Sequence, residues 1–286
     1  MVNLLYIHLK YFRLHKLLLV LVFLSLVAAC SSEKPNNSQI FRMPISNEPP
    51  TLDWSLATDS VSFDILTNIM EGLTQYDSNM DPVPAIAERW EISKSGQIIT
   101  YYLRDDVFWT DGKPVTAHDF EYSWKRLLNP ATAAQYAYFL FDIENAHDYN
   151  SGKISDPSKV GVLAKSEHVL EIRLKKPVVY FPSITTFMVT FPQRRDIVEK
   201  FGDHWTDPEN IVTNGPFKLN AWEHEYKLTL TANENFYEGR PTLDRIVAYV
   251  VREKTTALTL YETGELEMVE LPPVAIPHFK NHDEYE

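Results

Sequence analysis

Residues 103–120 read LRDDVFWTDGKPVTAHDF and join a predicted strand to a predicted helix through a tight turn. The strand occupies residues 97–104, QIITYYLR, where β-branched and aromatic residues alternate as they do in a half-buried strand. Asp111 and Gly112 then supply a turn signal, which is reinforced by Pro114. The segment therefore predicts a strand, a turn and a helix at fixed spacing.

The helix that follows has clear start and stop signals. Thr116, with Asp119 three residues later, resembles a capping box, and Pro130 cannot continue a helix. Asp119 also stands beside His118, so a catalytic pair is an alternative interpretation. We favour the capping role, because the box explains Asp119 without any chemistry.

Other segments indicate a mixed α/β (α+β) fold. Strands are predicted at residues 40–45, 168–174, 217–222, 226–233, 245–251 and 265–271, with the third and fourth forming a hairpin. Asp59 or Ser60 can cap a helix whose apolar face comprises Val61, Ile65, Leu66, Ile69, Met70 and Leu73. Thr255 or Thr256 can cap another helix, which ends near Gly264. The strict strand–helix alternation of a doubly wound sheet is not seen.

Composition excludes several classes of protein. The chain has 286 residues, of which 44% are hydrophobic and 23% charged, as in ordinary globular proteins. Its net charge of −12 argues against a nucleic-acid partner, because phosphate backbones attract basic surfaces. The single cysteine permits no internal disulfide and no Cys-based zinc site.

The N-terminus resembles an export signal. Residues 1–29 contain three basic residues and no acid, and residues 17–29 form an apolar run that is too short to span a bilayer. The string VAAC ends at Cys30 and resembles a bacterial lipoprotein box, in which the cysteine is lipidated after cleavage. Residues 30–39 then read as a polar tether. An ordinary signal peptide with a chance cysteine is the alternative.

Catalytic and metal motifs are weak. The strings GxSxG, HExxH, GxGxxG and the Walker A motif are absent, so we expect no catalytic residue, no metal and no cofactor. The acidic segment DSNMDPVPAIAE, residues 77–88, has the spacing of a calcium loop, but Pro82 replaces the glycine that the sharp turn needs. A turn between two elements is the favoured interpretation. Arg194 and Arg195 are interpreted as solvated surface charges.

Residues 87–130 resemble the oligopeptide-binding (peptide/nickel class) family of substrate-binding lipoproteins of ABC importers. The FWTDGKPVTAHDF string is the most specific part of this resemblance. Further similar segments follow in the family's order, at residues 51–60, 71–77, 170–181, 201–222, 233–239 and 261–271. The resemblance covers about residues 40–286.

The resemblance implies a two-lobed periplasmic-binding-protein-like fold, of which the chain holds the amino-terminal portion only. Residues 40–74 and 195–272 would form a discontinuous first lobe, residues 75–194 an inserted second domain, and residues 273–286 the start of a third domain. The rest of the third domain and a closing C-terminal segment have no counterpart in the sequence. We therefore expect a truncated protein that, alone, is only marginally folded and binds oligopeptides weakly or not at all.

The resemblance also implies a binding site for an extended peptide, held through its backbone between two lobes. The positions that match ligand-contacting residues of the family are Thr58, Asp59, Ser60, Val61, Tyr136, Asn214 and Gly215. Tyr136 belongs to an aromatic cluster with Tyr138, Phe139 and Phe141, so a purely structural role in packing is the alternative for this cluster.

The expected role is capture of oligopeptides for import outside the cytoplasm, by a monomer tethered to a bacterial membrane through its lipid alone. Its partners would be the oligopeptide ligand and an ABC permease and ATPase complex. Alternatives are another solute (a dipeptide, a nickel complex or haem), a non-functional gene fragment or half of a split protein, and, least favoured, a secreted hydrolase.

Overall fold

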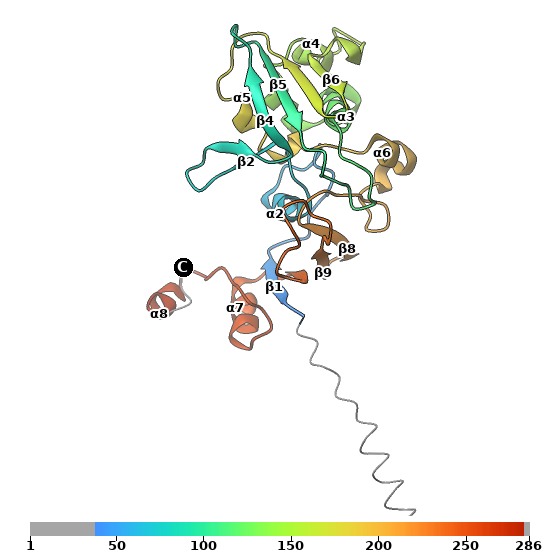
Figure 1. Cartoon of the computed structure of the whole chain (residues 1–286). Helices are drawn as coiled ribbons and strands as arrows, with labels where there is room; N and C mark the ends of the chain where they lie inside the picture. Colours follow the sequence, from blue (N-terminus) through green and yellow to red (C-terminus); the bar gives the residue numbers. More distant parts are fainter. Residues whose placement is uncertain (1–37, 283–286) are drawn as a thin grey trace, which may run out of the picture. The chain divides into compact units, whose positions relative to one another are not determined.

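The structure is a computed structural model that describes residues 38–282 (Figure 1). The predicted signal sequence, the proposed lipidation site Cys30 and most of the tether lie outside the described residues. So do residues 283–286.

The first sheet combines strands from both ends of the described chain. Its order is β1 (Ile40–Ile45), β10 (Arg245–Val250), β9 (Lys227–Ala232) and β8 (Phe217–Glu223). β1 runs parallel to β10, whereas β10, β9 and β8 pair antiparallel. These strands and the β8–β9 hairpin confirm the predictions for this part of the sequence.

The second sheet comes entirely from the middle of the chain. Its order is β4 (Ala87–Ile92), β5 (Ile98–Leu103), β7 (Val169–Arg173) and β6 (Val162–Ser166), and every pairing is antiparallel. Helix α3 (Ala117–Leu128) packs against β6 and β7 (Figure 1). Its buried side chains include Phe120, Trp124, Leu127 and Leu128, which are the apolar positions spaced for one helical face.

The capping box of α3 is present as predicted. The Asp119 carboxylate accepts hydrogen bonds from the Thr116 backbone N–H, at 2.8 Å, and from the Thr116 hydroxyl, at 3.1 Å. It also accepts one from the indole N–H of Trp109 at 3.3 Å. Asp119 therefore ties the turn at residues 103–116 to the helix, and these bonds account for it without His118.

Helix α2 (Ser60–Ile69) packs against β8 of the first sheet. Asp59 caps it, and Ile65, Leu66 and Ile69 are fully buried. The predicted cap is confirmed. The predicted apolar face is confirmed for Ile65, Leu66 and Ile69, whereas Met70 and Leu73 are buried beyond the end of the helix.

Two chain segments connect the sheets. The outgoing connection, residues 70–86, contains the small hairpin of β2 (Thr74–Tyr76) and β3 (Pro82–Pro84). The return connection, residues 174–216, contains α5 (Phe181–Ile184), α6 (Arg195–Phe201) and 3-10 turns at Met188–Thr190 and Gly202–His204. The connections lie side by side, because Gly215 N donates to Ile69 O at 2.9 Å, next to the start of the outgoing one.

The remaining elements are short. They are 3-10 helices at Pro130–Thr132, Gln135–Leu140 and Pro157–Lys159, and helices α4 (Ala146–Asn150), α7 (Lys254–Glu262) and α8 (Ile276–Phe279). Within residues 38–282, none of the helices has both the length and the apolar character needed to cross a membrane.

Two predictions near the C-terminus are wrong. Residues 265–271 form no strand, although Glu267 N donates one bond to Arg42 O of β1 at 2.9 Å. Alternation buries Leu266 but leaves Met268 46% exposed, so only one side chain of the pattern reaches the core. The cap of α7 is Glu253 rather than Thr255 or Thr256, and both threonines lie inside the helix.

The prediction that Arg194 is a solvated surface charge is also wrong. Its side chain is 6% exposed and lies between two carboxylates. Both of its terminal nitrogens are used, with Asp111 at 3.0 Å and Asp196 at 2.7 Å. The pairing makes burial of this charge tolerable, and only Arg195 is the exposed side chain that the sequence predicts.

Candidate functional site

The predicted ligand residues fall at the two ends of helix α2. Thr58, Asp59, Ser60 and Val61 lie at its start, whereas Asn214 and Gly215 contact its end. Because a ten-residue α-helix is about 15 Å long, these two groups are separated by about that distance. The structure brings Tyr136 to the first group only.

Tyr136 reaches the start of α2 from the 3-10 helix Gln135–Leu140. Its hydroxyl donates to the Thr58 carbonyl oxygen at 3.3 Å, so two segments that are 78 residues apart meet at this point. The distance is long for an O–H···O bond, and a carbonyl oxygen accepts two hydrogen bonds. The Thr58 carbonyl therefore has the capacity to accept a second hydrogen bond.

Aromatic rings surround Tyr136. Its ring centroid lies 6.3 Å from that of Phe63, 6.0 Å from Tyr138, 5.7 Å from Phe139 and 5.8 Å from Phe187. Tyr138 is 54% exposed, so the cluster has one open side. The cluster fixes the orientation of Tyr136 by packing, and the exposed ring of Tyr138 lies against Tyr136, which contacts Thr58.

Asp59 serves the helix itself. Its Oδ1 accepts from the Ser62 backbone N–H at 2.8 Å, and its Oδ2 accepts from the Ser62 hydroxyl at 2.7 Å. Ser60 is exposed and Val61 is half-buried. Of the four predicted residues in this loop, Thr58 and Ser60 therefore offer polar groups that are not needed for capping.

A buried ion pair holds the loop that leads to Thr58. Both Asp53 oxygens accept from the Arg126 guanidinium of α3, at 3.0 and 2.6 Å. The Asp53 side chain is 7% exposed and that of Arg126 17%. Trp205 Nε1 and Gln193 Nε2 also donate to Asp53, at 3.2 and 3.4 Å. This network fixes the loop to the second sheet's helix, and sequence reasoning missed it.

Asn214 and Gly215 pack against the end of α2. Asn214 Oδ1 accepts from the Glu71 N–H at 3.0 Å, and its Nδ2 donates to the Glu71 carbonyl at 3.3 Å. Gly215 passes so closely that a Cβ there would lie 2.5 Å from the carbonyl carbon of Ile69. Both residues are buried, and Asn214 is 1% exposed.

Glu71 carries a buried carboxyl group beside Asn214. Its Oε2 atom is inaccessible to solvent and has no hydrogen-bond partner. Burial raises the pKa of this carboxyl from 4.5 to about 7, although the Tyr237 hydroxyl and the Arg104 guanidinium favour its ionised form. The sequence gives no sign of this group, because it depends on four distant segments.

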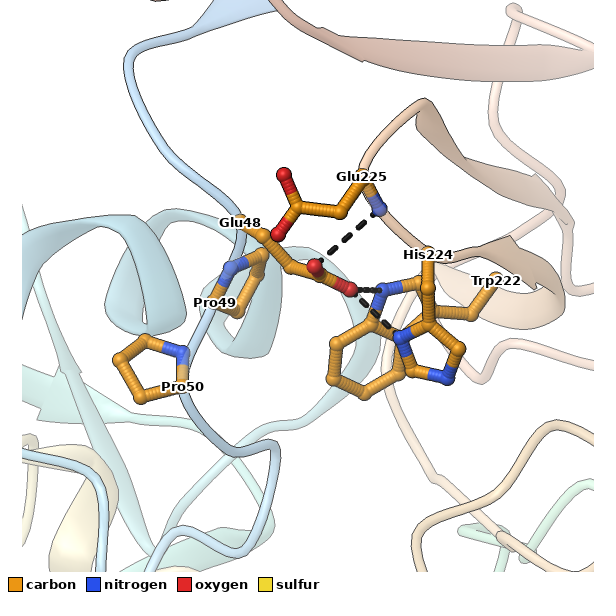
Figure 2. Close-up of a pocket in the computed structure, with 6 residues that line it drawn as sticks. All are labelled: Glu48, Pro49, Pro50, Trp222, His224 and Glu225. Atoms are coloured by element: carbon orange, nitrogen blue, oxygen red, sulfur yellow. Dashed lines mark hydrogen bonds and ion pairs between the residues drawn. The ribbon is translucent and has the colours of Figure 1, made fainter.

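A surface pocket of about 400 Å³ lies between the loop after β1 and the β8–β9 turn, lined by Glu48, Pro49, Pro50, Trp222, His224 and Glu225 (Figure 2). Glu48 Oε1 accepts from Trp222 Nε1 at 2.7 Å and lies 2.6 Å from His224 Nδ1. Its Oε2 accepts from the Glu225 N–H at 3.1 Å. Both oxygens of the carboxylate therefore help to tie this loop to the hairpin.

The acidic segment at residues 77–88 forms a hairpin turn. Asp77 Oδ1 accepts from the backbone N–H groups of Asn79 and Asp81, both at 2.9 Å, between β2 and β3. The turn prediction is confirmed. Across residues 38–282, no three His, Cys, Asp or Glu side chains are grouped so that they could hold a metal ion.

A family model described as bacterial extracellular solute-binding proteins, family 5 Middle, matches residues 81–286. The chain belongs to this family. Its sequence is 35% identical over 241 residues to the dipeptide-binding protein DppE of Bacillus subtilis. The match covers 84% of this chain and 44% of DppE.

Solved structures agree with the family 5 assignment. The substrate-binding domain of an oligopeptide ABC transporter from Bacillus anthracis superposes with a TM-score of 0.83 at 35% identity, over 86% of this chain and 48% of that one. The structure of Listeria monocytogenes OppA bound to peptide superposes with a TM-score of 0.83 at 32% identity, over 87% of this chain and 50% of that one. The fold predicted from the resemblance is confirmed. The chain spans about half the length of the relatives it matches.

Proposed function

We propose that this chain supplies part of an extracytoplasmic receptor that captures oligopeptides for an ABC importer. The observation that carries the proposal is the meeting of Tyr136 with the Thr58 carbonyl, where an accepting oxygen stands beside an aromatic surface. A peptide backbone N–H can donate to that oxygen, and a peptide side chain can cover the open ring of Tyr138. The similarity to a relative whose structure contains a bound peptide supports this choice of ligand.

In this mechanism the loop at residues 58–61 acts as a fixed edge for the ligand. The Asp53–Arg126 pair and the Asp59 cap hold its backbone in place before a peptide arrives, so little ordering has to accompany binding. Ser60 adds an exposed hydroxyl for a further backbone contact. Contacts to the peptide backbone are common to all sequences, which favours loose selectivity. Asn214 and Gly215 support α2 from its other end and would act indirectly.

Titration calorimetry with trialanine, pentaalanine and dialanine tests the proposal on the whole chain. We expect the longer peptides to bind, and Tyr136→Ala to weaken their binding by at least tenfold. Tyr226→Ala is the matched control, because Tyr226 is 53% exposed on the β8–β9 turn. A folded chain that binds none of the peptides at millimolar concentration would refute the proposal. A preference for dialanine would favour the dipeptide alternative, which the similarity to DppE supports.

The location of the receptor is part of the same proposal. The VAAC string and the apolar run before it support acylation at Cys30, which would tether the chain to a membrane and present it to a permease and ATPase complex. In a bacterial host, we expect labelled palmitate to be incorporated and the protein to sediment with membranes. Cys30→Ser should abolish both. Wild-type protein that takes up no label and stays in the soluble fraction would contradict the anchor.

A further inference from the structure

The two connections between the sheets meet at Glu71, which makes this position the natural hinge of the molecule. Asn214 of the return connection holds both the N–H and the carbonyl of Glu71 on the outgoing one, at 3.0 and 3.3 Å. Gly215 adds a bond to Ile69 O at 2.9 Å. Any reorientation of one sheet against the other has to pass through these backbone segments.

The Glu71 side chain is partly enclosed at this junction. Its Oε2 atom is buried without a partner, which is costly for an ionised carboxylate and much less so for a neutral carboxylic acid. The charged and titratable groups that face it are Arg104 from the end of β5, and Tyr237 and Glu238 from the loop after β9. Asn214 and Gly215 of the return connection contribute no charge.

Among residues 38–282, the cation that acts on Glu71 is Arg104, whose own contacts are with other residues. Arg104 Nε donates to the Ala85 carbonyl at 2.8 Å, and its guanidinium carbon lies 5.0 Å from the centre of the Tyr237 ring. Glu238 adds a like charge that opposes ionisation of Glu71. The junction is therefore arranged around a neutral carboxyl, and ionisation creates a buried charge that a local opening would relieve.

We propose that Glu71 is a protonation-controlled latch: its neutral form keeps the two connections packed together, and its ionisation loosens the hinge between the sheets. Burial raises the pKa of Glu71 to about 7, so the closed junction retains a proton that an open junction, with the ordinary value of 4.5, has already lost. The extra stability of the closed form is complete below pH 4.5 and is lost as the pH rises through about 7. The latch is independent of the solute that the receptor binds.

Amide hydrogen exchange of the whole chain, read by mass spectrometry at pH 5.5 and 8.0, tests the latch. Labelling times are scaled so that an unstructured peptide exchanges equally at both values. Using the two pKa values above, protection of peptides covering residues 69–73 and 213–216 should be roughly 25-fold lower at pH 8.0 than at pH 5.5. Peptides from β5 and β9 should be unchanged, which separates local opening from global unfolding.

The matched variants are Glu71→Gln, which removes the titration, and Glu88→Gln, which removes an exposed carboxylate. We expect the first to show equal protection at both pH values and the second to behave like wild type. Unchanged wild-type protection at the junction would overturn the proposal, and this measurement does not depend on whether a variant folds. It would also be overturned if Glu71→Gln kept the wild-type response, or if all segments lost protection together.

Discussion

Removing the Asp53 carboxylate is expected to destabilise the protein strongly. Asp53→Ala leaves the Arg126 guanidinium, 17% exposed, without the bidentate partner that it contacts at 3.0 and 2.6 Å. Breaking a buried pair from one side costs about 3–5 kcal/mol. For a domain of this size each kcal/mol corresponds to about 2–4 °C, so the melting temperature should fall by roughly 6–20 °C.

A double-mutant cycle separates the ion pair from simple loss of contacts. Asp53→Ala, Arg126→Ala and the double variant are compared by thermal melting and by urea unfolding, with Asp106→Ala as an exposed control expected within about 0.5 kcal/mol of wild type. The double variant should cost less than the sum of the single ones, by about 0.5–3 kcal/mol, because no charge is left unpaired. Additive losses, or an Asp53→Ala protein that melts like wild type, would refute the reasoning.

Three further perturbations have defined outcomes. Gly215→Ala should cost about 1–3 kcal/mol in urea unfolding, because its Cβ would lie 2.5 Å from Ile69, and an unchanged midpoint would contradict the close approach. Burial raises the pKa of Glu48, but hydrogen bonds from His224, Glu225 and Trp222 outweigh it and leave the pKa below 4.5. The stability from this carboxylate is therefore present above pH 4.5 and lost as the pH falls through the lowered value. Urea unfolding from pH 6 to pH 3 should show a smaller decline for Glu48→Gln than for wild type, and equal declines would show that the pairing is unimportant. Thr116→Ala should cost about 1 kcal/mol in thermal melting through loss of the cap, whereas Thr116→Ser should be close to neutral.

The local elements were predictable because their signals are local. Alternation located β5 and β7, and the Thr116–Asp119 pair located the start of α3, since each depends on residues within a few positions of one another. The strand predicted at residues 265–271 was wrong because a strand also needs a partner strand, which a local pattern does not reveal. Its alternation was genuine, but β1 offers it a single backbone bond.

The site was only partly predictable from sequence. The resemblance pointed to Tyr136 and Thr58, which do meet, but their role toward a peptide remains a proposal. The Asp53–Arg126 pair joins residues that are 73 positions apart, and neither residue carries a sign of its partner. The elevated pKa of Glu71 depends likewise on burial by distant segments, which a linear pattern does not encode.

The parallel pairing of β1 with β10 affects how the chain is made. At a ribosomal rate of about 5–20 residues per second, Ile40–Ile45 emerges roughly 10–40 s before its neighbour Arg245–Val250 exists. The antiparallel sheet from the middle of the chain contains all of its strands well before then. The second sheet can therefore form first, whereas the unpaired edge of the apolar strand β1 stays open until its partner β10 has been made.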